Sequence, residues 1–198
     1  MKKNKKENII ASTWLFDYDH VSHVVHVEDA FTPEECKKII EYGNTFKNKK
    51  GIVLSNDQEV RKSNISWLGL CDESKWFFER LSNIIRDFNN QYFKFDLYGI
   101  TEAMQFTHYK YPDGKYEAHL DKIYNGVVRK LSAVLQLSDP SKYNGGDLLL
   151  HQGPKPMIVN KKQGYLTLFP SYTLHEVRPI TKGERYSLVC WVNGKPFK

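Results

Sequence analysis

The chain has 198 residues, of which 40% are hydrophobic and 14% aromatic, so it can bury one substantial core but is short for two. No stretch approaches the run of about 20 apolar residues that spans a bilayer, and no apolar stretch of secretory-signal length follows the basic start. We therefore expect a single cytoplasmic domain over residues 1–198. Cys36, Cys71 and Cys190 are odd in number and form no CxxC pair, which argues against a disulfide framework and a thiolate zinc site.

The formal net charge is +6, and half of it lies in the first residues of the chain. Lys2, Lys3, Lys5 and Lys6 against Glu7 contribute +3 of that charge. We expect a disordered, solvated basic tail over 1–10. The alternative is contact with a nucleic acid or an acidic partner, in a patch extended by three further lysines: Lys47, Lys49 and Lys50.

After the tail, residues 21–27 are expected to form a short strand. The next segment has the sequence features of a helix start. Thr32 can cap the first turn, Pro33 suits the first helical position, and Glu35 completes a capping box three residues after the cap. A helix is therefore expected to run from this point to about residue 45.

Two more strands are expected at 51–54 and 62–68, followed by a second amphipathic helix over 72–90. The apolar residues of that helix recur at helical spacing, and we interpret them as core: Trp76, Phe77, Leu81, Ile84, Ile85 and Phe88. Residues 20–99 would then form a mainly helical support for the C-terminal half of the chain.

From residue 100 the sequence changes to short strands separated by turns. The expected strands are 104–109, 116–120, 128–137, 147–151, 157–159, 165–169, 175–180 and 185–192. Seven or eight strands at such intervals predict an antiparallel sandwich or barrel over 100–198.

The candidate functional residues in this region are His119, Asp121 and His175. Residues i and i+2 of a strand project to the same face, so His119 and Asp121 can reach one ion. In a jelly roll a strand late in the chain can lie beside an early one, which would bring His175 to the same point. Two imidazoles and one carboxylate on one face are the ligands of non-haem Fe(II) oxygenases, because three coordination positions stay open for co-substrate and O2.

Arg185 follows His175 by ten residues and supplies a cation for an anionic co-substrate. Its planar guanidinium can pair with both oxygens of a carboxylate and stays charged at any reachable pH. Ser187 lies on the same strand face and can donate a further hydrogen bond to that carboxylate. Tyr109 and Tyr116 can point phenols into the same cavity, although packing is the default role of tyrosines in strands.

The segment from Thr107 to Val192 resembles the 2-oxoglutarate and Fe(II)-dependent dioxygenases of the prolyl 4-hydroxylase group, particularly the PKHD-type hydroxylases. Three runs carry the resemblance, in the same order: HYKYPDGKYEAHLD, RKLSAVLQLSDPSKYNGGDLLL and GYLTLFPSYTLHEVRPITKGERYSLVCWV. The resemblance implies a mainly β fold with N-terminal helices (α+β), built on a cupin-like jelly-roll core, the double-stranded β-helix.

The same resemblance implies the roles of individual residues. His119, Asp121 and His175 would be the iron ligands and the catalytic centre. The residues implied to bind the co-substrate 2-oxoglutarate are Arg185, Tyr109 and Ser187. Those implied to contact the substrate are Arg129, Tyr116, Trp191 and Gln136.

Two positions depart from parts of this group. Collagen-type prolyl hydroxylases have a lysine where this chain has Arg185, so the match is to the branch that uses arginine. Gln136 stands where the oxygen-sensing enzymes have a tyrosine that hydrogen-bonds the co-substrate.

The implied activity is that of a prolyl 4-hydroxylase acting on a proline-containing peptide or protein. It would couple oxidative decarboxylation of 2-oxoglutarate by O2, giving succinate and CO2, to hydroxylation of a C–H bond, with ascorbate as a reductant. The substrate rests on analogy, and a free amino acid is an alternative. Residues 56–61 and 122–127 are the candidate loops that close over the substrate.

Other functions are weaker alternatives. A nucleic-acid demethylase would fit the positive charge of the chain. The pattern that such enzymes resemble has a second arginine six residues after the first, whereas this chain has Trp191 six residues after Arg185. A catalytically idle jelly-roll binding module would be free to lose any of the four key residues, and all four are present. A metal-binding jelly roll that uses no 2-oxoglutarate would leave Arg185 without an anion.

Overall fold

The structure, a computed structural model, describes residues 21–46, 49–50, 60–121, 123–124 and 126–196. The basic tail over 1–10, the strand expected at 51–54 and most of the candidate loop 56–61 lie outside the described residues. No helix in the described part of the chain is both long enough and apolar enough to cross a bilayer.

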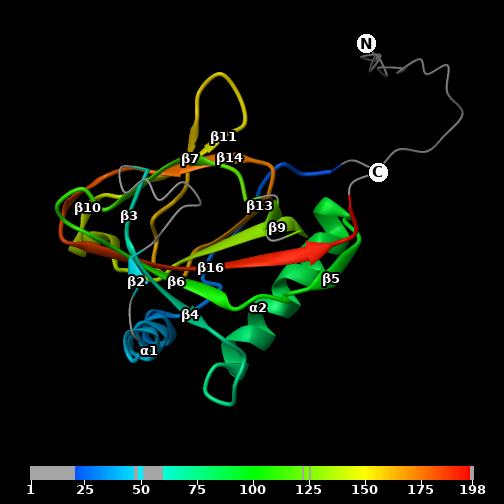
Figure 1. Ribbon diagram of the computed structural model, residues 1–198, viewed down its shortest axis with the longest axis horizontal. Coiled ribbons are helices and arrows are strands. Elements are labelled where there is room, and N and C mark those ends of the chain that lie inside the picture. Colours follow the sequence, from blue (N-terminus) through cyan, green and yellow to red (C-terminus); the bar gives the residue numbers. More distant parts are fainter. Residues whose placement is uncertain (1–20, 47–48, 51–59, 122, 125, 197–198) are drawn as a thin grey trace, which may run out of the picture.

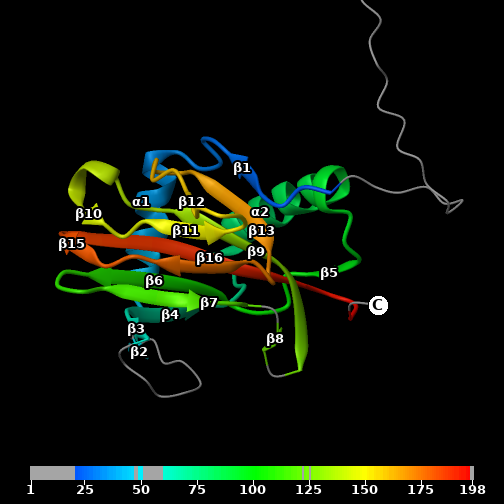
Figure 2. The same ribbon diagram turned by 90° about the horizontal axis from the view of Figure 1, so that it is seen from above.

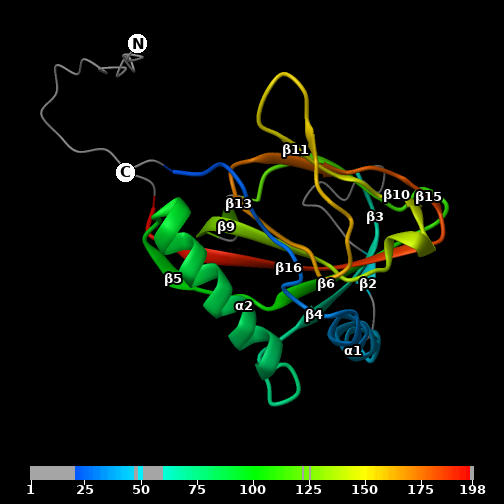
Figure 3. The same ribbon diagram turned by 180° about the vertical axis from the view of Figure 1, so that it is seen from behind.

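Two antiparallel sheets lie one above the other, and two helices cover the outer face of the larger one (Figures 1 and 3). In spatial order the larger sheet contains β1 (Val25–Val27), β13 (Leu166–Pro170), β9 (Val127–Gln136), β16 (Glu184–Gly194), β6 (Met104–Lys110), β4 (Asn64–Leu68) and β2 (Lys49–Lys50). Two short strands join it at the side, β5 (Leu97–Gly99) beside β16 and β8 (Ile123–Tyr124) beside β9. The strand order alternates between distant parts of the chain, as in a jelly roll.

The smaller sheet contains β12 (Met157–Ile158), β11 (Leu148–His151), β14 (Leu174–Val177), β7 (Lys115–His119) and β3 (Arg61–Lys62), in that order. The view from above shows this sheet stacked on the larger one (Figure 2). A third, two-stranded sheet pairs β10 (Asn144–Gly145) with β15 (Ile180–Lys182). The mainly β fold with N-terminal helices and a jelly-roll core is thus confirmed.

The strands of the larger sheet alternate between two environments, as residues of a strand must. On β9, Leu131, Ala133 and Leu135 belong to the core beneath the helices, whereas Val134 belongs to the cluster between the sheets. On β16, the side chains of Leu188, Cys190 and Val192 face the helices, whereas four alternating positions line a pocket between the sheets: Arg185, Ser187, Val189 and Trp191. Because side chains alternate along each strand, one face of the larger sheet packs in the core beneath the helices and the other face lines the pocket.

The first helix, α1 (Pro33–Asn44), begins as the sequence predicts. Thr32 Oγ1 accepts a hydrogen bond from the Glu35 backbone N–H at 3.2 Å, and Glu35 Oε2 accepts one from the Thr32 N–H at 2.9 Å. This capping box satisfies two N–H groups that the helix itself cannot pair. Cys36, Ile39 and Gly43 form the buried face.

The second helix, α2 (Lys75–Phe88), starts three residues later than expected and is extended by a π-helical turn, η1 (Asn89–Phe93). Lys94 ends this turn with φ of 56°, in the left-handed region. The apolar stripe identified in the sequence is core, and its most buried members are Phe77, Leu81 and Ile85.

Several expected strand boundaries were wrong. The first strand is confined to β1, Val25–Val27, instead of 21–27. The strand expected over 175–180 is divided between β14 and β15, because Pro179 has no N–H for the ladder. The strand expected to carry both His119 and Asp121 ends at His119.

Candidate metal centre and its pocket

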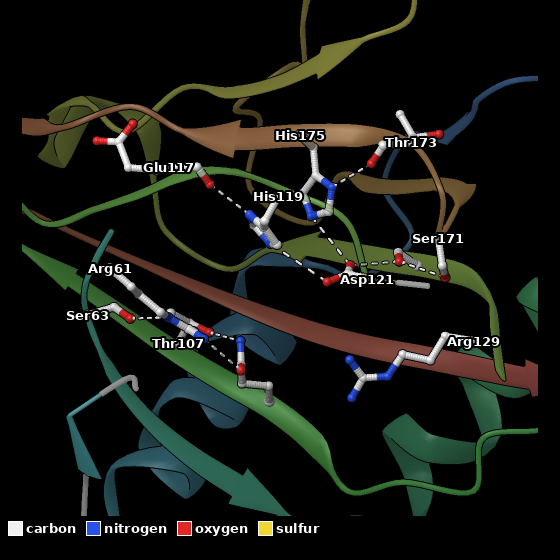
Figure 4. Close-up of polar contacts among 12 residues, drawn as sticks. Arg61, Ser63, Thr107, Glu117, His119, Asp121, Arg129, Ser171, Thr173 and His175 are labelled. Atoms are coloured by element: carbon white, nitrogen blue, oxygen red, sulfur yellow. Dashed lines mark hydrogen bonds and ion pairs between the residues drawn. The ribbon is translucent and has the colours of Figure 1, made fainter. Parts of the chain in front are cut away.

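His119 and His175 meet because β7 and β14 are neighbours in the smaller sheet, where the two histidines are directly opposite each other. Asp121 lies two residues after the end of β7, and its backbone N–H donates a hydrogen bond to the Ser171 carbonyl, at 2.9 Å. Among the described residues, these three side chains form a group whose ligand atoms all lie within 4.8 Å of one another. Figure 4 shows the three side chains converging between the sheets.

Hydrogen bonds to the backbone fix the orientation of the two histidine rings, and the sequence did not predict these hydrogen bonds. His119 Nδ1 lies 2.8 Å from the Glu117 carbonyl oxygen, and His175 Nδ1 lies 2.9 Å from the Thr173 carbonyl oxygen (Figure 4). A carbonyl can only accept, so each Nδ1 carries the proton and each Nε2 keeps a lone pair for a metal.

Asp121 has its own support and a matching protonation state. Ser132 Oγ donates to Asp121 Oδ2 at 2.8 Å, and the same hydroxyl lies 3.0 Å from Ser171 Oγ. Burial alone would raise the pKa of Asp121, but its neighbours His175, His119, Trp191 and Ser132 together hold it below its ordinary value. Burial, and then the charge of His175, lower the pKa of His119 to about 4. At neutral pH His119 is therefore neutral and Asp121 ionised, the states in which they bind a divalent cation.

The triad opens into a pocket of about 450 Å³ between the sheets. Its walls combine the triad with aliphatic, aromatic and arginine side chains. The expected residues that line it are Tyr109, Tyr116, Arg129, Arg185, Ser187 and Trp191.

Arg185 is 1% exposed and points its guanidinium at Gln136 and into this pocket. Its Nε and Nη2 donate to Gln136 Oε1, at 3.2 and 2.9 Å. Its Nη1 is buried and has no hydrogen-bond partner within the described part of the chain. Because an unpaired buried cation is costly, this arrangement fits a site that is completed by an anion. Tyr109 borders the same guanidinium, with its ring centroid 5.3 Å from Arg185 Cζ.

Three of the four residues expected to contact substrate line the pocket with the triad, and the fourth, Gln136, is not among its lining residues. The ring of Tyr116 stacks on His119 with centroids 3.5 Å apart. Arg129 Cζ lies 3.7 Å from the ring centroid of Trp191. The same guanidinium forms an ion pair with Glu102 through two hydrogen bonds, Nε to Oε1 at 2.9 Å and Nη2 to Oε2. Gln136 is buried and contacts Arg185.

Sequence reasoning did not identify Arg61, Gln105 and Trp67, which also line the pocket. Arg61 was included only as the end of a candidate loop. For Gln105 a signal was present, since residues 105, 107 and 109 share one face of β6 and Tyr109 had been recognised. For Arg61 the sequence held no such signal, because β3 has two residues and its place beside β7 is a long-range pairing.

Fold and site together define a class: jelly-roll proteins with two histidines and one carboxylate on a common face, beside a buried arginine. Residues 104–193 of the chain match the family model of the 2OG-Fe(II) oxygenase superfamily.

Among its relatives, a PKHD-type hydroxylase of Prochlorococcus marinus is 38% identical over 78 residues, which make up 39% of this chain and 35% of that relative. The aligned segments span 31% to 39% of the lengths of the first three such relatives.

Solved structures of prolyl hydroxylases share the fold. A prolyl-4-hydroxylase of Pseudomonas putida aligns with a TM-score of 0.70 and 21% identity, over 88% of this chain and 94% of that one. A prolyl hydroxylase of Trichoplax adhaerens, solved in complex with a hypoxia inducible factor oxygen degradation domain peptide fragment, aligns with a TM-score of 0.73 and 18% identity, over 87% of this chain and 84% of that one.

Proposed function

We propose that this chain is an Fe(II)- and 2-oxoglutarate-dependent dioxygenase that hydroxylates a prolyl residue of a peptide or protein, as a prolyl 4-hydroxylase does. The observation that carries the proposal is the presence, in one pocket, of the His119, Asp121 and His175 triad and of a buried Arg185 with one unpaired donor. The PKHD-type relatives support a hydroxylase, and the peptide complex of the Trichoplax enzyme supports the choice of a peptide substrate.

The triad fits iron in donor type and in protonation. His119 and His175 would hold the metal through Nε2, and Asp121 through its carboxylate, while Ser132 fixes the orientation of that carboxylate. Iron at this site would supply the oxidative chemistry that couples decarboxylation of 2-oxoglutarate by O2, giving succinate and CO2, to hydroxylation of a C–H bond. Three protein ligands leave open positions for both reactants.

Arg185 would bind the carboxylate of 2-oxoglutarate that is remote from the metal. Its Nη1 is the donor that remains after Gln136 has accepted from Nε and Nη2. Gln136 therefore acts on the co-substrate by orienting Arg185, and this is the role we assign to it. Ser187 and Tyr109, on the same wall, complete the co-substrate site.

Tyr116, Trp191 and Arg129 would border the prolyl substrate. Aliphatic side chains exclude water from the reacting atoms, which protects an oxidising site from unproductive turnover; they are Val134, Leu148, Val177 and Val189. A cytoplasmic location is part of the proposal, since all three cysteines are unpaired, as in a reducing compartment. Ascorbate would keep the iron reduced between turnovers.

The test is succinate formation from 2-oxoglutarate by the purified chain with Fe(II), in the presence and absence of proline-containing peptides. The wild type should form succinate, faster with a substrate peptide, and slow down when ascorbate is omitted. His119→Ala should lower the rate by at least about 100-fold. Arg185→Met should raise the KM for 2-oxoglutarate by about 10- to 100-fold, because it removes a charged hydrogen bond.

Two variants serve as matched controls for this experiment. His23→Ala and Arg86→Met change the same residue types at exposed positions away from the pocket, and both should behave as the wild type. A wild-type protein that forms no succinate, or an active His119→Ala variant, would refute the proposed function.

A further inference from the structure

A second buried donor without a partner lies beside Arg185, on the side chain of Tyr143. Tyr143 follows the 3-10 helix η2 (Pro140–Lys142), directly precedes β10, and is 3% exposed. Its hydroxyl is buried and finds no hydrogen-bond partner in the described ranges, and the same is true of Arg185 Nη1. Because a buried polar atom without a partner costs free energy, two of them side by side point to one missing acceptor.

The fold places these two side chains on either side of one glycine. β10, β15 and the start of β16 lie at the same end of the molecule (Figures 2 and 3). A Cβ built on Gly146, where φ is 64°, would lie 3.2 Å from Arg185 Cδ and 3.5 Å from Tyr143 Cε2. Burial raises the pKa of Tyr143, and the charge of Arg185 opposes that rise. The phenol is therefore close enough to the guanidinium to share a ligand with it.

Polar side chains around this pair have partners of their own. Lys161 Nζ lies 5.4 Å from the ring centroid of Tyr143, but it is bound to Asp147 Oδ1 and to the Gly145 carbonyl oxygen, each at 2.7 Å. Gln136 Oε1 already accepts from Nε and Nη2 of Arg185. The Tyr143 hydroxyl and Arg185 Nη1 are therefore left to bind a ligand.

Tyr143 can meet such a ligand at Arg185 and not along the rest of the pocket. It packs with Tyr109, Leu148 and Val177 in the cluster between the sheets, and those three line the pocket, whereas Tyr143 itself does not. Its hydroxyl would contact a bound molecule where that molecule reaches Arg185. In the proposed function, this part of the molecule is the carboxylate of 2-oxoglutarate that is remote from the metal.

We propose that the Tyr143 hydroxyl and Arg185 Nη1 bind the same remote carboxylate, so that Tyr143 helps to select a dicarboxylic 2-oxo acid as co-substrate. This rests on the proposed function, which assigns Arg185 to 2-oxoglutarate. A carboxylate accepts hydrogen bonds through both of its oxygens and donates none when ionised. It can therefore pair with both donors at once and leave neither of them buried without a partner.

The test compares two acids of the same chain length. 2-Oxoglutarate carries the remote carboxylate, 2-oxopentanoate has a methyl group in its place, and both offer the same 1-carboxylate and 2-oxo group to a metal. Affinities are measured by isothermal titration calorimetry of the Mn(II)-loaded protein, which requires no turnover. The variants are Tyr143→Phe and Arg185→Met. Tyr165→Phe is the matched control, because it removes the hydroxyl of another buried tyrosine of the same cluster, whose ring packs against His26.

Tyr143→Phe should weaken binding of 2-oxoglutarate by about tenfold and binding of 2-oxopentanoate by less than about twofold. Arg185→Met should show the same selectivity, and Tyr165→Phe should match the wild type with both acids. The affinity of Tyr143→Phe for Mn(II) alone should be unchanged. Without ligand, this variant should melt at no lower temperature than the wild type, because the hydroxyl that it lacks has no hydrogen bond to lose.

Unchanged affinity of Tyr143→Phe for 2-oxoglutarate would overturn the inference. So would an equal loss of affinity for the two acids or a loss of Mn(II) binding, since either would indicate a general effect on the site, and so would a wild type that binds the two acids equally. Failure of the proposed function looks different, because the wild type would then form no succinate, while the titrations with Mn(II) would still report on Tyr143.

Discussion

Hydrogen bonds hold the side chains of the triad in fixed orientations, whereas a nearby arginine has a donor that is not hydrogen-bonded. Each imidazole is fixed through Nδ1 by a carbonyl two residues earlier in the chain, and Asp121 is fixed by Ser132. Arg185, by contrast, is buried and has one donor, Nη1, without a partner among the residues that the structure describes. Incomplete pairing of this kind is costly for the empty protein and favours binding of the missing partner.

Among these side chains, His119 gives a pH dependence. Its pKa is about 4 in the folded protein and about 6.5 in the unfolded chain. As the pH falls from 6.5 to 4, His119 binds a proton in the unfolded state but not in the folded state, so the free energy of unfolding decreases over this range. The loss is up to about 3 kcal/mol.

The prediction is checked by urea unfolding of the metal-free protein at pH 7, 6, 5 and 4. His119→Gln, which cannot titrate, should lose less free energy of unfolding than the wild type over the same range. Equal losses in the two proteins would show that the burial of His119 does not control its protonation.

Among the secondary-structure elements, alternation along the central strands positions the site. β6, β9 and β16 each pack one set of side chains under α1 and α2 and present the other set to the pocket. The helices therefore affect the site through the sheet. A close contact connects α1 to β6, where a Cβ built on Gly43 would come 2.7 Å from the ring of Phe106.

Gly43→Ala should therefore destabilise the protein by about 1–3 kcal/mol, as overpacking of a core does. In an ordinary helix interior the same change stabilises by about 0.5–1 kcal/mol. A decrease in the free energy of unfolding would therefore indicate the close contact with Phe106. Gly69→Ala is the control, because a Cβ there meets nothing within 4 Å. The measurement is chemical denaturation of the three proteins, and a Gly43→Ala variant as stable as the wild type would contradict the packing of α1 on β6.

Across the molecule as a whole, the metal would connect parts of the chain that are far apart in sequence. Its ligands come from the end of β7 and from β14, separated by more than fifty residues and adjacent only because the jelly roll brings them together. A ligand that binds the folded state alone stabilises it by about 2.7 kcal/mol at a concentration 100 times its Kd.

Anaerobic thermal melts with excess Fe(II) should accordingly show a higher Tm than melts with EDTA. His175→Ala and Asp121→Ala should remove most of the difference while leaving the EDTA melts cooperative. A metal-induced shift that persists in both variants would place the metal elsewhere.

Features that depend on neighbours along the chain could be predicted from the amino-acid sequence. The capping box of Thr32 and Glu35, the apolar stripe of α2 and the strands β6, β9 and β16 follow from local periodicity and turn chemistry. The candidate ligands and Arg185 could also be named, because the spacing and the resemblance both lie in the C-terminal half of the chain.

Contacts between side chains on different strands required the three-dimensional structure. The fold sets His119 opposite His175 on neighbouring strands. It brings Gln136 into a hydrogen bond with Arg185, and Glu102 into one with Arg129. It also brings Arg61, from a two-residue strand, into the pocket. Periodicity assigns a face to each residue but not a neighbouring strand, and the order β14, β7, β3 in the smaller sheet arises from packing of the whole chain. For that reason the ligands could be named from the sequence, whereas the charge balance of the pocket could not.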